Sequence, residues 1–301
     1  MIPTRKGVSA SSVALPAGSW HTVFDFLCDR FPAITPHEWT ARFEEGLVLD
    51  AQGHALGLTQ RYTPHTLLHY YRRVPDEPEL PFQAQVLFQD AHVVVADKPH
   101  FMPVTPAGRY VRSSLLVQLK EQLGVDTLSP LHRIDRETAG LVLFSVVPSE
   151  RNAYQALFRE RRVHKVYQAV APVRHDLTLP LTYRSRLESS AQFFRSHEVS
   201  GKPNSETTVR LLKTDNQQGH TTGLYQLEPV TGQRHQLRIH MNALGLPIEG
   251  DQFYPTVLRG PTEVEDFSHP LQLLAQQMAF TDPITGNART FHSALRLRLA
   301  L

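Results

Sequence analysis

The stretch His132-Arg133-Ile134-Asp135-Arg136-Glu137-Thr138-Ala139-Gly140 leads directly into an apolar run, residues 141–147. A run that begins Leu-Val-Leu-Phe is typical of a buried strand, so the turn before it should hold Asp135 close to the core. A carboxylate near a low-dielectric core stays ionised only where a cation favours its charged form, and it is then a candidate nucleophile. An isolated Asp in a turn more often only accepts backbone hydrogen bonds. A second segment, far downstream, is needed to decide between these interpretations.

That second segment is residues 231–241, Thr-Gly-Gln-Arg-His-Gln-Leu-Arg-Ile-His-Met. The spacing from Gln236 to Leu244 predicts a helix that Gly245 ends. Arg234 and Arg238 are four residues apart and share one face, while Leu237 lies among the apolar positions that would anchor the helix. On its own, this pattern is more typical of the exposed basic face of an ordinary surface helix than of an active site. His235 and His240 would lie on different sides of the helix without a suitably spaced Cys or acidic partner, so we expect no metal site.

The composition is that of an ordinary globular protein. The chain has 301 residues, of which 41% are hydrophobic and 20% charged, enough for one large domain and a small one. The net charge of +2 permits an anionic partner but does not demand one. The single cysteine, Cys28, excludes an internal disulfide framework. No run is apolar enough to span a membrane, and residues 1–18 lack the apolar core of a signal peptide, so we expect a cytoplasmic protein.

The amino-terminal part divides into two segments. Residues 1–19 are rich in Ser, Pro, Ala and Gly and are expected to form a loose leader. Residues 20–78 predict a small domain of two helices and a hairpin. Thr22 is the expected cap of the first helix, and Thr35-Pro36-His37-Glu38 has the pattern of a capping box with proline at the first helical position. The segment Pro75-Asp76-Glu77-Pro78 reads as a linker.

From residue 79 to 301, predicted strands and helices alternate. A hairpin of residues 86–88 and 93–95 leads into Asp97-Lys98-Pro99. Helices are expected to begin at Ser113 or Ser114 and at Ser149. The mixed order of elements favours an α+β domain with a mixed, largely antiparallel sheet flanked by helices.

Taken together, these segments resemble the RluA family of RNA pseudouridine synthases. The family pattern has an Asp-Lys-Pro strand end, a His-Arg-Leu-Asp block, a Lys-x-Tyr strand and a Thr-Gly-Arg-x-His-Gln-x-Arg-x-His block that leads to Gly-Asp. In this chain they occur in the same order as Asp97-Lys98-Pro99, the Asp135 stretch, Lys165-Val166-Tyr167 and the Arg238 segment running to Gly250-Asp251. The resemblance covers residues 82 to 300. More distantly, residues 20–78 resemble the small RNA-binding domain that many members carry.

The resemblance implies an enzyme that isomerises specific uridines of structured RNA to pseudouridine. Asp135 would be the nucleophile on a flipped-out uridine, Tyr167 would lie against the base, and Arg238 would pair with Asp135 and keep it ionised. Apolar walls would come from Leu237, the strand at Leu141, and Ile248. The residues expected to bind substrate are Arg133, Arg136, Lys165, Arg234, His235 and Leu237.

The implied reaction is redox-neutral and needs no activated donor, so no cofactor and no metal are expected. The implied partner is RNA, with ribosomal RNA favoured over transfer RNA and with no DNA or membrane involved, and we expect a monomer. The sequence leaves open which uridine is modified and whether the attack falls on the sugar or the base ring. Four positions depart from the family pattern, and none is an expected catalytic residue: Phe101, Ala139, Gln233 and Arg234.

Two other functions compete with this interpretation. A catalytically inactive RNA-binding protein could keep the fold, but the complete set of Asp135, Tyr167 and Arg238 argues against it. A carboxylate-based hydrolase of nucleosides or glycosides would need a second acid beside Asp135. The nearest acid in sequence is Glu137, which we expect to face solvent.

Overall fold

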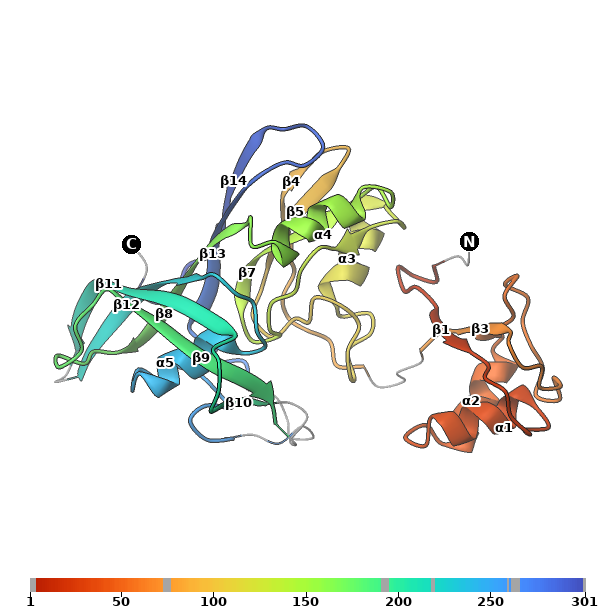
Figure 1. Ribbon diagram of the computed structural model, residues 1–301. Coiled ribbons are helices and arrows are strands. Elements are labelled where there is room, and N and C mark those ends of the chain that lie inside the picture. The colour runs from red at the N-terminus through yellow and green to blue at the C-terminus, as the bar shows by residue number, and fades with distance from the viewer. Residues whose placement is uncertain are drawn as a thin grey trace. The chain divides into compact units, whose positions relative to one another are not determined.

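The computed structural model describes residues 4–72, 77–190, 195–217, 220–258, 260 and 266–299 (Figure 1). The chain forms two compact units. The N-terminal unit is Met1–Glu79 with Thr105–Asp126, and the C-terminal unit is Leu80–Val104 with Thr127–Leu301. Residues 105–126, which the sequence placed in the large domain, thus belong to the N-terminal unit. In the described part of the chain, no helix is long and apolar enough to cross a membrane.

The N-terminal unit packs two helices against a small antiparallel sheet (Figure 1). The predicted capping box of Thr35 with Glu38 begins α2 (Pro36–Glu44). The predicted Thr22 cap begins α1 (Val23–Arg30), where it forms a capping box with Asp25 that was not predicted. Each box satisfies amide groups that the first turn of a helix leaves unpaired. The sheet order is β1–β3–β2, with strands β1 (Ser11–Ala14), β2 (Val48–Leu49) and β3 (Leu67–Tyr70).

The prediction that residues 1–19 form a loose leader is wrong for the part that the structure describes. Strand β1 lies in this segment and pairs with β3 in the register Ser11↔Tyr70. The next residue, Leu15, is only 2% exposed. Four residues that alternate between partly buried and exposed positions are too short a pattern to predict, and their partner strand is more than 50 residues away. Of the predicted linker, Pro75 and Asp76 lie outside the described residues.

Helix α3 (Leu115–Leu123) belongs to the N-terminal unit because distant segments of that unit contact the chain just before it. The Glu77 carboxylate accepts hydrogen bonds from three consecutive backbone amides, residues 111–113, at 2.6–2.9 Å. Val8 packs with Val111 and Val117 in a small buried cluster. Ser114 is the N-cap residue but makes no side-chain capping bond, and Gly124 ends the helix in the left-handed region.

The C-terminal unit is built on an 11-stranded sheet in its described residues, with the order β10–β9–β11–β12–β8–β13–β7–β5–β4. Strand β14 pairs with β13, and β6 with β7. Every pairing is antiparallel except that of β13 with β7, so the predicted mixed, largely antiparallel sheet is confirmed. The strands are β4 (Gln85–Gln89), β5 (Val93–Lys98), β6 (Ser129–Pro130), β7 (Ala139–Ser145), β8 (His164–Pro172), β9 (Leu181–Ser189), β10 (Ser196–Val199), β11 (Ser205–Gln217), β12 (His220–Pro229), β13 (Leu273–Thr281) and β14 (Ala288–His292).

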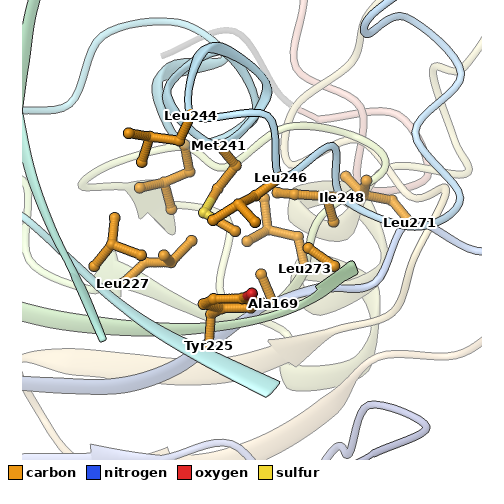
Figure 2. Close-up of a cluster of buried hydrophobic side chains, with 12 residues drawn as sticks. Ala169, Tyr225, Leu227, Met241, Leu244, Leu246, Ile248, Leu271 and Leu273 are labelled. Carbon is orange, nitrogen blue, oxygen red and sulfur yellow. The ribbon is translucent and has the colours of Figure 1, made fainter. Parts of the chain in front are cut away.

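Two helices accompany this sheet, α4 (Arg151–Arg159) and α5 (Gln236–Ala243). The predicted cap of α4, Ser149, is one residue off, since Glu150 is the N-cap residue and makes no side-chain capping bond. Helix α5 has the predicted bounds to within one residue. Its apolar side chains Met241 and Leu244 point toward Ala169 of β8 and toward β12, which fixes the helix on the sheet (Figure 2).

The Asp135 stretch, residues 132–140, leads into β7. All seven residues of β7 are buried, between β5 on one side and β13 on the other. Gly140 has φ +109°, and a Cβ at this position would lie 2.4 Å from the carbonyl oxygen of Ala275. Only glycine fits there without a shift of backbone, which lets the Asp135 turn run close to β13.

Candidate active site

A pocket of about 90 Å³ opens beside Asp135, where the turn before β7 meets β8, β13 and the N-terminal end of α5. The Asp135 side chain is 24% exposed, so the carboxylate is accessible from the pocket. Four separate segments supply the lining: Arg133, Ile134, Asp135 and Thr138; Lys165 and Tyr167; Pro229, Thr231, Gly232, Gln233, His235, Gln236, Leu237 and Arg238; and Leu273.

Arg238 is the buried cation of the site. Its Nε and Nη2 donate to the two carboxylate oxygens of Asp251 at 2.8 and 2.6 Å. Its Nη1 lies 3.6 Å from Asp135 Oδ2 and 3.6 Å from Glu137 Oε2, and no acceptor in the described residues is within hydrogen-bonding geometry of it. Burial lowers the pKa of Arg238, but Asp251 and the two other carboxylates outweigh burial and raise it overall. A charged guanidinium thus lies beside the Asp135 carboxylate.

Glu137 does not face solvent, so that prediction is wrong. The residue is 7% exposed, and its carboxylate accepts from Arg136 Nε at 3.1 Å and lies beside Arg238. Burial raises the pKa of Glu137, but Arg238 and Arg136 outweigh burial and lower it overall. The two cations explain how a tight turn, closed by the bond from Thr138 N to Asp135 O, can bury a second acid. Glu137 is not part of the pocket lining, which does not suit a pair of acids on either side of a glycosidic bond.

Tyr167 lies on β8 and forms part of the pocket wall. Burial, together with the charge of Asp135, raises the pKa of Tyr167. The side chain is therefore a neutral phenol at pH 7, and it presents an aromatic ring and one hydroxyl group to the pocket.

The backbone of the Asp135 turn is held by Lys98, the last residue of β5, and by His100, two residues later. Neither residue was predicted to have this role. Lys98 Nζ donates to the carbonyl oxygens of Pro99 at 2.9 Å and Arg136 at 3.0 Å. His100 Nδ1 lies 2.7 Å from the carbonyl oxygen of Glu137. Burial lowers the pKa of Lys98 to about 7, against the opposing effects of Glu137 and Asp135. In the sequence, the Asp97-Lys98-Pro99 motif was the feature that could have indicated this role.

Of the predicted substrate-binding residues, four line the pocket and two do not. Arg133, Lys165, His235 and Leu237 are in the lining. Arg136 instead pairs with Glu137, as described above, and Arg234 is exposed to solvent at the start of the α5 segment. Burial, with a contribution from Arg161, lowers the pKa of Lys165 to about 8.

The apolar walls also differ in part from the prediction. Leu237 is a wall residue, together with Ile134, Pro229 and Leu273. Leu141 and Ile248 are not in the lining: Leu141 belongs to another buried cluster, and Ile248 packs in the cluster that includes Leu237 and Leu273. The described residues hold no group of three or more His, Cys, Asp or Glu placed to bind a metal ion.

Comparison with known proteins assigns the family. Residues 92–243 match the family model described as RNA pseudouridylate synthase. The chain is 33% identical over 225 residues to a dual-specificity RNA pseudouridine synthase RluA of Pasteurella multocida, covering 72% of this chain and 94% of that protein. The chain belongs to the RluA family of RNA pseudouridine synthases. It is thus an enzyme of RNA modification, as the sequence predicted.

Other relatives of the RluA family agree. An RluA of Haemophilus influenzae is 30% identical, with 73% of this chain and 94% of that protein covered. An uncharacterized RNA pseudouridine synthase of Synechocystis sp. is also 30% identical, with 77% of this chain and 79% of that protein covered. Among solved structures, human RNA pseudouridylate synthase domain containing 1 matches with a TM-score of 0.57 at 22% identity, over 72% of this chain and 85% of that one. That likeness shows a shared fold.

Proposed function

We propose that this RluA-family enzyme converts uridine to pseudouridine in structured RNA with Asp135 as the nucleophile. The observation that carries the proposal is the position of the Asp135 carboxylate. It lies at the accessible side of the pocket, 3.6 Å from a buried guanidinium that Asp251 holds in place. A carboxylate that substrate can reach, beside a fixed cation, has the position that a nucleophile needs.

The reaction requires the target nucleotide to leave the stack, because a stacked or paired base cannot enter a pocket. Asp135 then forms a bond to the nucleotide and the bond from C1′ to N1 breaks. The freed uracil turns and C5 bonds to C1′ in place of N1. The bond to Asp135 breaks and frees the carboxylate, and the proton on C5 is lost while N1 gains one. Product and substrate have the same atoms, so the chain needs no redox partner and no activated donor.

We assign the face of the base to Tyr167. Aromatic side chains bind flipped-out bases by stacking, and the walls formed by Ile134, Leu237 and Leu273 exclude water from the ring. Tyr167, a neutral phenol, is the pocket group best suited to help remove the C5 proton. Arg133 and Lys165, at the same pocket, supply positive charge for the phosphates on either side of the target.

The proposed substrate is ribosomal RNA, with transfer RNA as the second possibility. Several relatives are named dual-specificity RNA pseudouridine synthase, which supports more than one RNA target. The N-terminal unit would add an RNA-binding surface through a cavity of about 370 Å³ whose lining includes Arg5, Lys6, Arg72 and Arg112. We further expect a cytoplasmic monomer that acts on RNA and not on DNA.

Pseudouridine mapping in cells tests this proposal. Total RNA from cells that lack the gene should miss pseudouridine at one or a few positions, and the wild-type gene should restore them. Asp135→Asn should not. If no position changes when the gene is removed, or if purified wild-type protein binds RNA but never modifies it, the chain is an inactive RNA-binding protein. Release of uracil from uridine nucleotides would instead favour a hydrolase.

A further inference from the structure

His235 connects two parts of the site. Its Nδ1 lies 2.9 Å from the hydroxyl oxygen of Tyr254, and its Nε2 lies 3.9 Å from Asp135 Oδ1. The residue precedes α5 with φ +58°, a left-handed backbone conformation that residues other than glycine adopt only rarely. The ring is 6% exposed, with the Phe253 ring stacked near it at a centroid distance of 6.1 Å and Tyr254 at its edge. Backbone and packing therefore fix the ring in one orientation.

The hydrogen bonds of Tyr254 determine which ring nitrogen carries the proton. The Tyr254 hydroxyl donates its one hydrogen to the carbonyl oxygen of Ser196 at 2.9 Å and accepts from the Ser196 amide at 3.0 Å. Burial raises the pKa of Tyr254, so this hydrogen stays on the oxygen. The remaining contact, to His235, is then one in which the hydroxyl oxygen accepts and Nδ1–H donates. If Nδ1 of His235 accepted the Tyr254 hydrogen instead, the buried carbonyl oxygen of Ser196 would face the hydroxyl oxygen with no hydrogen between them.

A neutral imidazole with its proton on Nδ1 has a free lone pair on Nε2. Burial lowers the pKa of His235, and the charges of Arg238 and Arg234 act in the same direction against those of Asp135 and Glu137. The ring is thus neutral at pH 7, and Nε2 is an acceptor on the Asp135 side of the pocket. The 3.9 Å separation is too long for a direct hydrogen bond and leaves room for a donor from a ligand.

We propose that Nε2 of His235 accepts a hydrogen bond from the 2′-hydroxyl of the target nucleotide, so that the pocket selects ribose. The inference rests on the proposed function. A uridine within an RNA chain has only two donors, the 2′-hydroxyl and the N3–H. The 2′-hydroxyl is bonded to the carbon next to C1′, where the glycosidic bond breaks, whereas N3 is on the far side of the base. An acceptor adjacent to Asp135 therefore lies nearer the sugar. The 2′-hydroxyl also distinguishes RNA from DNA.

The tautomer can be measured without any RNA. In the ¹⁵N spectrum of histidine-labelled wild-type protein at pH 7, we expect Nδ1 of His235 to be protonated and Nε2 to be unprotonated. Tyr254→Phe removes the acceptor for Nδ1–H, so a mixture of both tautomers should follow. A protonated Nε2 in the wild-type protein would overturn the proposal. This result does not depend on whether the protein modifies RNA.

The contact itself is tested with a synthetic RNA hairpin that carries one mapped target uridine, either as uridine or as 2′-deoxyuridine. Loss of one buried hydrogen bond should lower kcat/KM of the wild-type protein about 10-fold on the deoxy hairpin. His235→Asn keeps a donor at the level of Nδ1 and suits a left-handed residue, but it lacks the Nε2 acceptor. It should be about 10-fold slower on uridine and should scarcely distinguish the two hairpins. His235→Gln places an acceptor at the level of Nε2 and should regain part of the discrimination.

An equal deoxy penalty in the wild-type protein and in both variants would overturn the assignment to the 2′-hydroxyl. A wild-type protein that modifies no uridine would contradict the proposed function and leave the tautomer result standing. If His235→Asn does not fold, the tautomer of His235 and the deoxy penalty of the wild-type protein still test the proposal.

Discussion

Arg238 is held so that one nitrogen faces Asp135. Asp251 binds the guanidinium through two of its three nitrogens and also accepts from the backbone amides of Phe253 and Tyr254 at 2.8 and 3.1 Å. The Asp251 carboxylate is therefore fixed by four donors. The third nitrogen of Arg238 points between Asp135 and Glu137 without a hydrogen bond in the described residues. Such a site is organised before substrate arrives, which lowers the cost of reaction.

Asp251→Asn should therefore affect both stability and activity. The change leaves a buried guanidinium facing a neutral amide, and breaking a buried ion pair costs about 3 kcal/mol or more. We expect a loss of this size in the urea-derived free energy of unfolding and a fall in pseudouridine formation, since Arg238 would no longer be held toward Asp135.

The matched control for Asp251→Asn is Glu206→Gln. Glu206 also binds an arginine through two nitrogens, at 2.9 and 3.3 Å from Arg184, but this pair is exposed and outside the pocket. Exposed pairs contribute less than about 1 kcal/mol. Equal losses of stability in the two variants would contradict the role given to burial.

At the scale of single residues, the sequence indicated candidate residues but not all of their contacts. Asp135 and Arg238 were identifiable as candidates because the segments around them occur in the order of the RluA family pattern, whereas each segment alone is typical of a polar turn or a surface helix. The ion pair of Arg238 with Asp251 was not, since the motif Gly250-Asp251 carries no sign of its partner. Arg133 and Arg136 look alike in sequence, and only the direction of the turn separates the one at the pocket from the one that pairs with Glu137.

Among the strands and helices, β7 requires a glycine at its second residue, Gly140. Gly140→Ala should place a Cβ 2.4 Å from Ala275 O, so either β7 or β13 must shift. We expect a loss of at least about 3 kcal/mol in the free energy of unfolding, together with reduced activity because the Asp135 turn would move. Urea denaturation and pseudouridine formation measure the two effects.

Gly286→Ala is the control for Gly140→Ala. Gly286 also has a positive φ, +75°, but no atom lies within 4 Å of the position of its added Cβ. Only the backbone penalty of about 1 kcal/mol applies there. If Gly140→Ala were no more harmful than Gly286→Ala, close approach to β13 would not be the reason for a glycine.

Elements with local signals were predictable, and elements that depend on distant partners were not. Helices α1 and α2 carry their own capping boxes, and the hairpin of β4 and β5 has a turn between two apolar runs. Strand β1 exists because β3 lies beside it, and α3 joins the N-terminal unit through Glu77 and Val8, which come much earlier in the chain. Non-local contacts of this kind leave no periodic pattern in the sequence.

At the scale of the whole molecule, the N-terminal unit should contribute to RNA affinity through its basic cavity. Arg72 and Arg112, both exposed cations of this cavity, are expected to contact phosphates. The double variant Arg72→Ala/Arg112→Ala should weaken RNA binding and reduce the slope of log K against log salt by about 1 to 2. Arg61→Ala, an exposed arginine of the same unit away from the cavity, should leave the slope unchanged. An unchanged slope in the double variant would refute the contact.

Stability should fall in acid because several histidines are buried in neutral form. Burial lowers the pKa of His100 to about 4, of His132 to about 3 and of His240 to about 4. Between pH 6.5 and about 4 the unfolded chain binds protons at these residues that the folded chain does not, so the free energy of unfolding decreases as pH falls through this window. Urea midpoints measured from pH 7 to pH 4.5 should show it.

The variant His240→Gln isolates one of these groups. Its urea midpoint should depend less steeply on pH than that of the wild-type protein, since one proton fewer is taken up on unfolding. An identical or steeper dependence would show that His240 is not neutral in the fold.

The central claim is that Asp135, and not the neighbouring Glu137, attacks the target nucleotide. Single-turnover pseudouridine formation on a mapped RNA, compared for the wild-type protein, Asp135→Asn and Glu137→Gln, tests it most directly. We predict that Asp135→Asn lowers the rate by more than about 10³-fold while Glu137→Gln still forms pseudouridine. Pseudouridine formed by Asp135→Asn at the wild-type rate would contradict the account.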